Sequence, residues 1–201
     1  MLFHSPGSCS NGILFLLHEL GVEHVVQIVD VRKREQISPH YLDQNPKGKV
    51  PALLLPDGSV LTEFQAIALW LGSFHPERKL WPDTSLEQAR MMEMLDFIVG
   101  TIHMRGFVFL KVPGKFHSDP DVQKALRIHG REQIDKGLAV LSQVMGDADY
   151  LLGSFSLADA ALFYILNWAF SEKLSVPQNL ADCHARLWAR TSIVASHPLW
   201  G

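Results

Sequence analysis

Hydrophobic and polar positions change their rhythm once along this chain, near residue 75. Before that point, short apolar or β-branched runs typical of strands alternate with longer stretches of helical periodicity. Gly21 ends one such stretch, and Ser38 followed by Pro39 begins another, as helix stop and start signals do. The predicted elements are a strand at 2–4, a helix at 11–20, a strand at 24–30, a helix at 38–44, strands at 52–55 and 60–62, and a helix at 64–74.

This order, βαβαββα, is that of a thioredoxin-like domain. A helix connects the first two strands, so they are expected to be parallel with a right-handed crossover. The last two strands flank Pro56-Asp57-Gly58, a turn sequence that predicts an antiparallel hairpin. The first part of the chain is therefore predicted to be an α/β unit with helices packed on a sheet.

Strand signals disappear in the rest of the chain. Met91, Leu95, Ile98 and Ile102 follow one another at spacings of four, three and four, which predicts one apolar face of a long helix over 86–108. Asp119 followed by Pro120 begins another helix, which is expected to run to about residue 145.

Ser156 and Asp159 have the spacing of a capping box, with Phe155 placed as a hydrophobic staple. The helix they begin is apolar nearly all round and should be the buried centre of an all-helical domain. A final helix is predicted at 180–196. Two prolines and a run of charges indicate a linker at 76–85, so the predicted domains are residues 1–75, thioredoxin-like, and 86–201, all-α.

Composition narrows the range of partners. The net charge is -3 and the basic residues do not form a stripe, so nucleic acid is not expected as a partner. No stretch reaches the ~20 apolar residues of a membrane span, and the first residues lack the basic start of a signal peptide. Cys9 and Cys183 are too few for a disulfide framework and suit a reducing compartment, which predicts a cytoplasmic protein.

The run Asn45 to Leu55 is the most informative local feature. Pro51 at the first position of a strand forces Val50 to be extended, so Val50 can offer its backbone groups to a bound peptide. Glu63 follows the hairpin and stands at the beginning of a helix. The alternative is a proline-started edge strand that binds nothing, with a Glu63 carboxylate that only complements the helix dipole.

Cys9 lies in a short loop between the first strand and the first helix. Free N–H groups and the positive end of the helix dipole favour a thiolate there, whereas Cys183, inside an apparent helix, reads as a small buried hydrophobe. No second cysteine follows Cys9 closely, so thioredoxin-type internal disulfide chemistry is excluded. A mixed disulfide with a small thiol and its exchange are still possible.

In their order along the chain, these features resemble the soluble glutathione transferase superfamily, and within it the bacterial beta class. The resemblance rests on Pro6 to Ser10, on Asn45 to Leu53, on Leu61-Thr62-Glu63 with Ala66-Ile67, and on His103 late in the first long helix. It implies a glutathione transferase fold, glutathione as co-substrate with no metal, and a homodimer acting in detoxification. Phe64, in place of a small or hydroxyl residue, and His4, in place of a tyrosine, depart from the family pattern.

The resemblance also implies roles for particular residues. Cys9, Ser10 and His103 would be catalytic, with Cys9 beside the glutathione sulfur and His103 polarising a thiol or a water. Asp96, seven residues before His103 and therefore on the same helix face, would reach the γ-glutamyl group from the neighbouring subunit. The groups expected to bind glutathione are Lys33, Lys49, Val50, Pro51 in the cis form, Glu63, the N–H of Phe64, and Asp96.

Several of these residues have a plainer interpretation. Lys33 and Lys49 could be solvated surface charges, and a histidine such as His103 on an apolar helix face is more often structural. Phe107, Phe109, Phe116 and Trp168 could line an apolar pocket for the second substrate, or could simply be core.

The leading hypothesis is a glutathione transferase that conjugates reduced glutathione to small hydrophobic electrophiles, with thiol transfer through Cys9 as a variant. The alternative is a non-catalytic binding or regulatory module of the same fold, which Phe64 favours. A metal hydrolase is a poor third, because no His-Glu-x-x-His or similar ligand spacing occurs.

Overall fold

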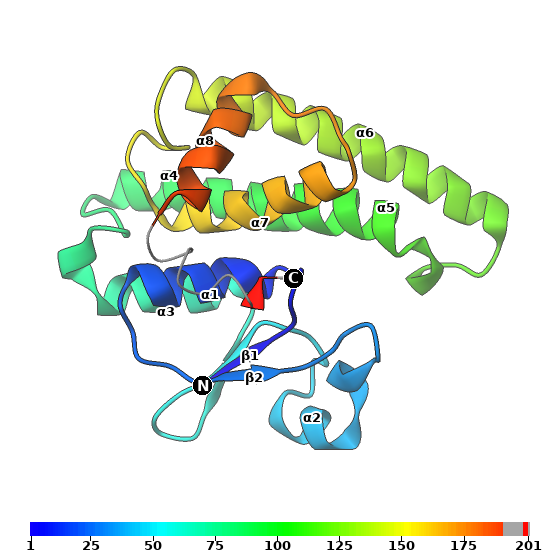
Figure 1. Ribbon diagram of the computed structural model, residues 1–201, viewed down its shortest axis with the longest axis horizontal. Helices are drawn as coiled ribbons and strands as arrows, with labels where there is room; N and C mark the ends of the chain where they lie inside the picture. The colour runs from blue at the N-terminus through cyan, green and yellow to red at the C-terminus, as the bar shows by residue number, and fades with distance from the viewer. Residues whose placement is uncertain (191–198, 201) are drawn as a thin grey trace. The chain divides into compact units, whose positions relative to one another are not determined.

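The computed structural model describes residues 1–190 together with Leu199 and Trp200. The chain divides into two units (Figure 1). The first consists of Met1–Pro82 and the described residues from Arg186 onward, and the second of Asp83–Ala185. The division therefore falls inside the predicted linker, but the end of the chain groups with the first unit and not with the helical domain.

The first unit has the predicted βαβαββα order, with two short 3-10 helices added. Its sheet has the strand order β2-β1-β3-β4, in which β1 and β2 are parallel and β3 pairs antiparallel with both β1 and β4. The strand predicted at 24–30 is shortened to three residues. The elements are β1 (Leu2–His4), α1 (Ser10–Glu19), β2 (Val26–Ile28), η1 (Glu35–Ile37), α2 (Pro39–Gln44), β3 (Ala52–Leu54), β4 (Val60–Thr62), α3 (Phe64–Phe74) and η2 (Pro76–Arg78).

Alternation along the strands divides the core of this unit between the two sheet faces. Phe3 packs on Tyr41 of α2 at 5.5 Å between ring centroids, and Val29 and Ala52 complete that cluster. The next residue of β1, Leu2, points to the other face, where α1 and α3 pack together (Figure 1). The sheet is thus covered on both faces, and the functional groups are left to the loops at its edge.

The second unit is helical, as predicted. Its central helix α7 is buried at every position from Leu157 to Leu166 and begins at the predicted capping box of Ser156 and Asp159. Its elements are α4 (Ser85–Asp96), η3 (Phe97–Phe107), α5 (Val108–Lys111), η4 (Pro113–Lys115), α6 (Pro120–Met145), α7 (Leu157–Ser171) and α8 (Gln178–Trp188). The end of the helix predicted at 180–196 lies outside the described residues.

The long helix predicted at 86–108 is not uniform. Its middle part, η3, is a π-helix in which the N–H of Val108 donates to the carbonyl of His103, five residues earlier. Met91, Leu95, Ile98 and Ile102 are buried as predicted. In the wider winding, however, the seven residues from Asp96 to His103 no longer amount to two turns. This spacing therefore does not place Asp96 and His103 on one helix face. None of the helices in the described residues is long and apolar enough to cross a membrane.

His184 is a titratable group held within the helical unit. Its Nε2–H donates to Oδ1 of Asn167 at 2.8 Å, and its ring stacks on Phe170 with 4.7 Å between centroids. Burial lowers the pKa of His184 to about 4 from an ordinary value of 6.5. As the pH falls below 6.5, the unfolded chain binds a proton that the folded chain refuses, so His184 lowers the stability progressively toward pH 4.

We expect the thermal unfolding midpoint to be lower at pH 5 than at pH 7. The difference should be smaller in His184→Gln, because glutamine can keep the bond to Asn167 without titrating. Thermal unfolding of both proteins at the two pH values measures the difference. An equal fall in both would show that His184 does not contribute.

Candidate functional site

The predicted site residues of the first unit converge on one edge of the sheet. Cys9 follows β1, Lys33 follows β2, Val50 comes just before β3, and Glu63 follows β4. Since β3 runs opposite to the other three strands, all four positions fall at the same end of the sheet. Along this edge the order is Lys33, Cys9, Val50, Glu63.

The edge has the length of a short extended peptide. Three strand spacings of ~4.8 Å give ~14 Å, and three extended residues reach ~10 Å. The lysine and glutamate side chains at the two ends can close the difference. A peptide with a carboxylate at one end, a thiol in the middle and an ammonium at the other end would meet a cation, a thiol and an anion in turn.

The Val50 peptide is held in place by hydrogen bonds to the residue before it. The Val50–Pro51 bond is cis, as the resemblance implies. The carbonyl of Lys49, one residue earlier, accepts from the Tyr41 hydroxyl at 2.6 Å and from Nδ2 of Asn45 at 2.8 Å. Neither supporting residue was among the predicted site residues, although Asn45 belongs to the informative run.

Cys9 is half-buried at the N-terminus of α1, and its thiol donates to the carbonyl of Val50 at a sulfur–oxygen distance of 3.4 Å. Burial raises the pKa of Cys9 to about 12, and the Glu63 charge adds to the rise. The N–H groups of Cys9 and Ser10 and the charge of Lys49 act in the opposite direction. The helix end therefore acts as predicted, but desolvation outweighs it, and the thiol stays protonated at neutral pH.

Ser10 is fully buried. Its hydroxyl oxygen lies 2.7 Å from Nδ1 of His4 and 2.7 Å from the hydroxyl of Ser8. Ser10 is thus part of a hydrogen-bonded network inside the loop, a setting that its sequence position did not reveal.

Glu63 has an unusual backbone for a residue with a side chain, with φ at 72° and ψ at 130°. Its carboxylate does not cap α3. Instead it accepts from Nζ of Lys47 at 2.9 Å, and Lys47 also donates to the hydroxyl of Thr62 at 2.8 Å. Such strain tends to persist where function requires it. Lys33 and Lys49 were among the predicted site residues, but Lys47 was not.

The remaining predicted groups of the first unit are placed as follows. Lys33 is exposed and pairs with Asp30 at 3.7 Å, and Lys49 is exposed near Cys9. The Phe64 ring is buried under the first turn of α3, so only its backbone can serve a ligand.

In the second unit, the rings of His103, Phe107 and Tyr164 pack around Trp168. His103 places Nδ1 3.3 Å from the Tyr164 hydroxyl and its ring 4.8 Å from that of Trp168, and Phe107 lies 5.4 Å from the same indole. Phe107 has no exposed surface and belongs to the core. It cannot line a pocket as it stands. Trp168 and Phe109 are half-buried, and Phe109 packs on Phe116 at 4.8 Å. Asp96 is exposed at the end of α4.

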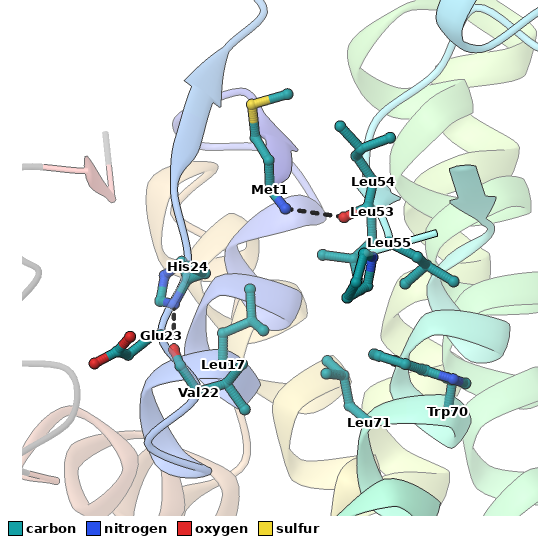
Figure 2. Close-up of a pocket in the computed structure, with 11 residues that line it drawn as sticks. Met1, Leu17, Val22, Glu23, His24, Leu53, Leu54, Leu55, Trp70 and Leu71 are labelled. Atoms are coloured by element: carbon teal, nitrogen blue, oxygen red, sulfur yellow. Dashed lines mark hydrogen bonds between the residues drawn. The ribbon is translucent and has the colours of Figure 1, made fainter. Parts of the chain in front are cut away.

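A cavity of about 250 Å³ lies in the first unit, between the start of β1, the end of β3 and helices α1 and α3 (Figure 2). Its walls are mainly apolar, with Leu17 on one side and Trp70 with Leu71 on another, and the Met1 ammonium donates to the Leu54 carbonyl at 2.9 Å beside it. It lies at the opposite end of β1 from Cys9, and no predicted site residue lines it.

No three His, Cys, Asp or Glu side chains in the part of the chain that the structure describes are arranged to hold a metal ion.

A thioredoxin-like unit with a cysteine and an edge for an extended peptide, followed by an all-α unit, defines the class of glutathione-binding transferases. Comparison with known proteins agrees. Residues 7–73 match the family described as glutathione S-transferase, N-terminal domain, and residues 86–189 match glutathione S-transferase, C-terminal domain. The chain belongs to the glutathione S-transferase family, near its bacterial beta class, which confirms the predicted fold and the assignment as an enzyme.

Three relatives illustrate the match. Glutathione S-transferase GstA of Escherichia coli O157:H7 is 35% identical over 178 residues, 87% of this chain and 85% of the relative. A bacterial beta class glutathione S-transferase of Sphingomonas chungbukensis is 31% identical with a TM-score of 0.83, covering 100% of this chain and 98% of that one. A sphingomonad glutathione S-transferase complexed with glutathione is 30% identical with a TM-score of 0.83, covering 97% and 96%.

Proposed function

We propose that this protein conjugates reduced glutathione to small hydrophobic electrophiles and that Cys9 supports a second, thiol-transfer activity. The observation that carries the proposal is the order of groups along the sheet edge. Lys33 or Lys49 suits the glycine carboxylate, the Val50 backbone suits the cysteinyl backbone, and Glu63 suits the γ-glutamyl ammonium. The glutathione-bound relative supports the same ligand.

In conjugation the nucleophile is the sulfur of glutathione. Its thiol loses a proton, the thiolate attacks an electrophilic carbon, and the new S–C bond forms as the leaving group departs or the addition completes. The N–H groups at the start of α1 would stabilise the thiolate. Because the Cys9 thiol is protonated at neutral pH, it does not compete strongly for the electrophile.

Thiol transfer needs Cys9 itself. Its thiolate attacks the glutathione sulfur of a mixed disulfide between glutathione and another thiol, giving the Cys9–glutathione disulfide and releasing the other thiol, and a glutathione thiolate then attacks the glutathione sulfur of that disulfide, releasing oxidised glutathione and restoring Cys9. The raised pKa of Cys9 favours this activity at alkaline pH.

The resemblance to the family also implies roles for residues of the second unit. We assign His103 to polarising a thiol or a water, Trp168 and Phe109 to contact with the apolar electrophile, and Asp96 to the γ-glutamyl group of a neighbouring subunit in a homodimer. Cys9 and Cys183 are thiols and do not form a disulfide, which fits a cytoplasmic location, with detoxification as the expected role.

Intact-mass measurement after incubation with oxidised glutathione tests the site. We expect one glutathione adduct on the wild type and on Cys183→Ala, and none on Cys9→Ala, because Cys183 is fully buried. Conjugation of 1-chloro-2,4-dinitrobenzene, an activated aryl chloride, should be saturable in glutathione and should persist in Cys9→Ala while thiol transfer is lost.

Two results would contradict this division of labour. Equal loss of both activities in Cys9→Ala would make one thiol responsible for both. Saturable glutathione binding without conjugation of the aryl chloride or of other activated electrophiles would favour a non-catalytic binding module.

A further inference from the structure

The end of the described chain is fastened to the loop that carries Cys9. Trp200 is buried, and its carbonyl accepts from the Gly7 N–H at 2.8 Å and from Nδ2 of Asn11 at 2.9 Å. The carbonyl of Leu199 lies 2.8 Å from Nε2 of His4. Loop residues on both sides of Cys9, and the strand before it, are therefore bonded to a segment about 190 residues away in the chain.

His4 links this segment to the loop by a chain of hydrogen bonds in which the donor and the acceptor of each bond can be assigned. A carbonyl only accepts, so Nε2 of His4 carries a hydrogen and donates to Leu199. His4 is fully buried, and burial lowers the pKa of His4, so the ring is neutral and Nδ1 is an acceptor. The 2.7 Å contact between Nδ1 and the Ser10 oxygen is then a bond donated by Ser10, which is much shorter than the 3.3 Å from the same hydroxyl to its other acceptor, the Ser5 carbonyl.

The same assignment of donors and acceptors extends from Ser10 to Ser8. With its hydrogen directed at His4, the Ser10 oxygen accepts from the Ser5 N–H at 3.1 Å and from the Ser8 hydroxyl at 2.7 Å. The Ser8 oxygen in turn accepts from the Ser10 N–H at 3.2 Å. Hydrogen bonds thus hold both neighbours of Cys9, and the direction of these bonds is set by the tautomer of His4.

We propose that His4 is a positioning residue for the glutathione site, which holds the Ser8-Cys9-Ser10 segment in its working geometry by accepting a hydrogen bond from Ser10. This rests on the proposed function. It also changes the role of Ser10, because a hydroxyl that donates to His4 has no hydrogen left to donate to a bound thiolate. Ser10 serves catalysis through the position of the loop and not as a donor to sulfur.

Two amide variants separate the roles of the two imidazole nitrogens. In His4→Asn the amide oxygen takes the place of Nδ1 and can accept from Ser10, but the donor to Leu199 is lost. In His4→Gln the amide nitrogen takes the place of Nε2 and can donate to Leu199, but the acceptor for Ser10 is lost. Both remove the ring, and asparagine, shorter by one methylene, leaves the larger void, so a packing effect alone would be greater in His4→Asn, the variant expected to stay close to the wild type.

We expect His4→Gln to raise the KM for glutathione by about tenfold with kcat within about threefold, and His4→Asn to stay within about threefold of the wild type in both. The rate of Cys9 alkylation by iodoacetamide can be measured by mass spectrometry at a series of pH values. This alkylation profile should differ from that of the wild type in His4→Gln and not in His4→Asn. Thermal unfolding checks that both variants are folded.

A double-mutant cycle with Ser10→Ala examines the bond itself. If His4 acts through Ser10, adding Ser10→Ala to His4→Gln should cause little further loss. Equal loss in the two His4 variants, wild-type behaviour in both, or additive loss in the cycle would overturn the proposal.

The alkylation profile separates this proposal from the proposed function, because it reads the position of Cys9 without glutathione. If the wild type binds no glutathione and yet the profile shifts only in His4→Gln, the proposed function fails and the role of His4 stands. If glutathione is conjugated and the profile is the same in all three proteins, the role of His4 fails alone.

Discussion

Glu63→Gln should weaken glutathione binding by about 10- to 100-fold, the loss of one hydrogen bond between charged groups. The Glu63 carboxylate lies at the end of the sheet edge where the γ-glutamyl ammonium is expected. Glutamine keeps the shape of the side chain and the strained backbone, and removes only the charge. The pair with Lys47 involves side chains that are 53% exposed, so its loss should cost little stability. Calorimetric titration of both proteins with reduced glutathione measures the change in Kd.

Lys47→Met is the matched control for this effect. It breaks the same ion pair from the other side and leaves the carboxylate in place. If Glu63 binds the ligand ammonium, affinity in Lys47→Met should be unchanged or slightly higher, because Glu63 then has no competing cation. Equal weakening in both variants would show that the pair holds the loop and that Glu63 does not bind the ligand directly.

Most of the fold could be predicted because its signals are local. Ser38, Asp119 and the capping box at Ser156 mark helix starts through bonds to the next few residues, and the structure has each of them. The π-helix at Phe97–Phe107 could not be predicted, because the buried spacing of four between Ile98, Ile102 and Gly106 also fits an α-helix. The segment packs against α6, a contact between parts of the chain that no local pattern records.

The site divides in the same way. Cys9, Val50 and Glu63 could be placed on one edge because each lies at the end of a predicted strand. The protonated state of Cys9 could not, since it depends on how deeply the folded chain buries the sulfur. The partnership of His4 with Leu199 spans 195 positions, and the two residues share no motif. Glu63 and Lys47 likewise meet only when the hairpin brings their loops together.

The contact between α6 and the helix before it depends on glycine. A Cβ on Gly130 would lie 2.6 Å from the carbonyl oxygen of Gly106 and 2.8 Å from the backbone nitrogen of Leu110. Both are backbone atoms and cannot turn aside as a side chain can. The two helices would have to separate or shift, which would disturb the buried residues Ile102 and Ile134 beside the contact.

Gly130→Ala should therefore destabilise the helical unit by about 2 kcal/mol, because overpacking against backbone atoms should cost about 3 kcal/mol, the upper end of its usual range, while alanine returns about 1 kcal/mol in helix propensity. In a chain of this size that corresponds to a fall in the unfolding midpoint of about 4–8 °C. Gly100→Ala is the control, since a Cβ there meets nothing within 4 Å. Its midpoint should stay the same or rise. Thermal unfolding followed by circular dichroism compares the two variants, and equal midpoints would mean that the close approach at Gly130 relaxes without cost.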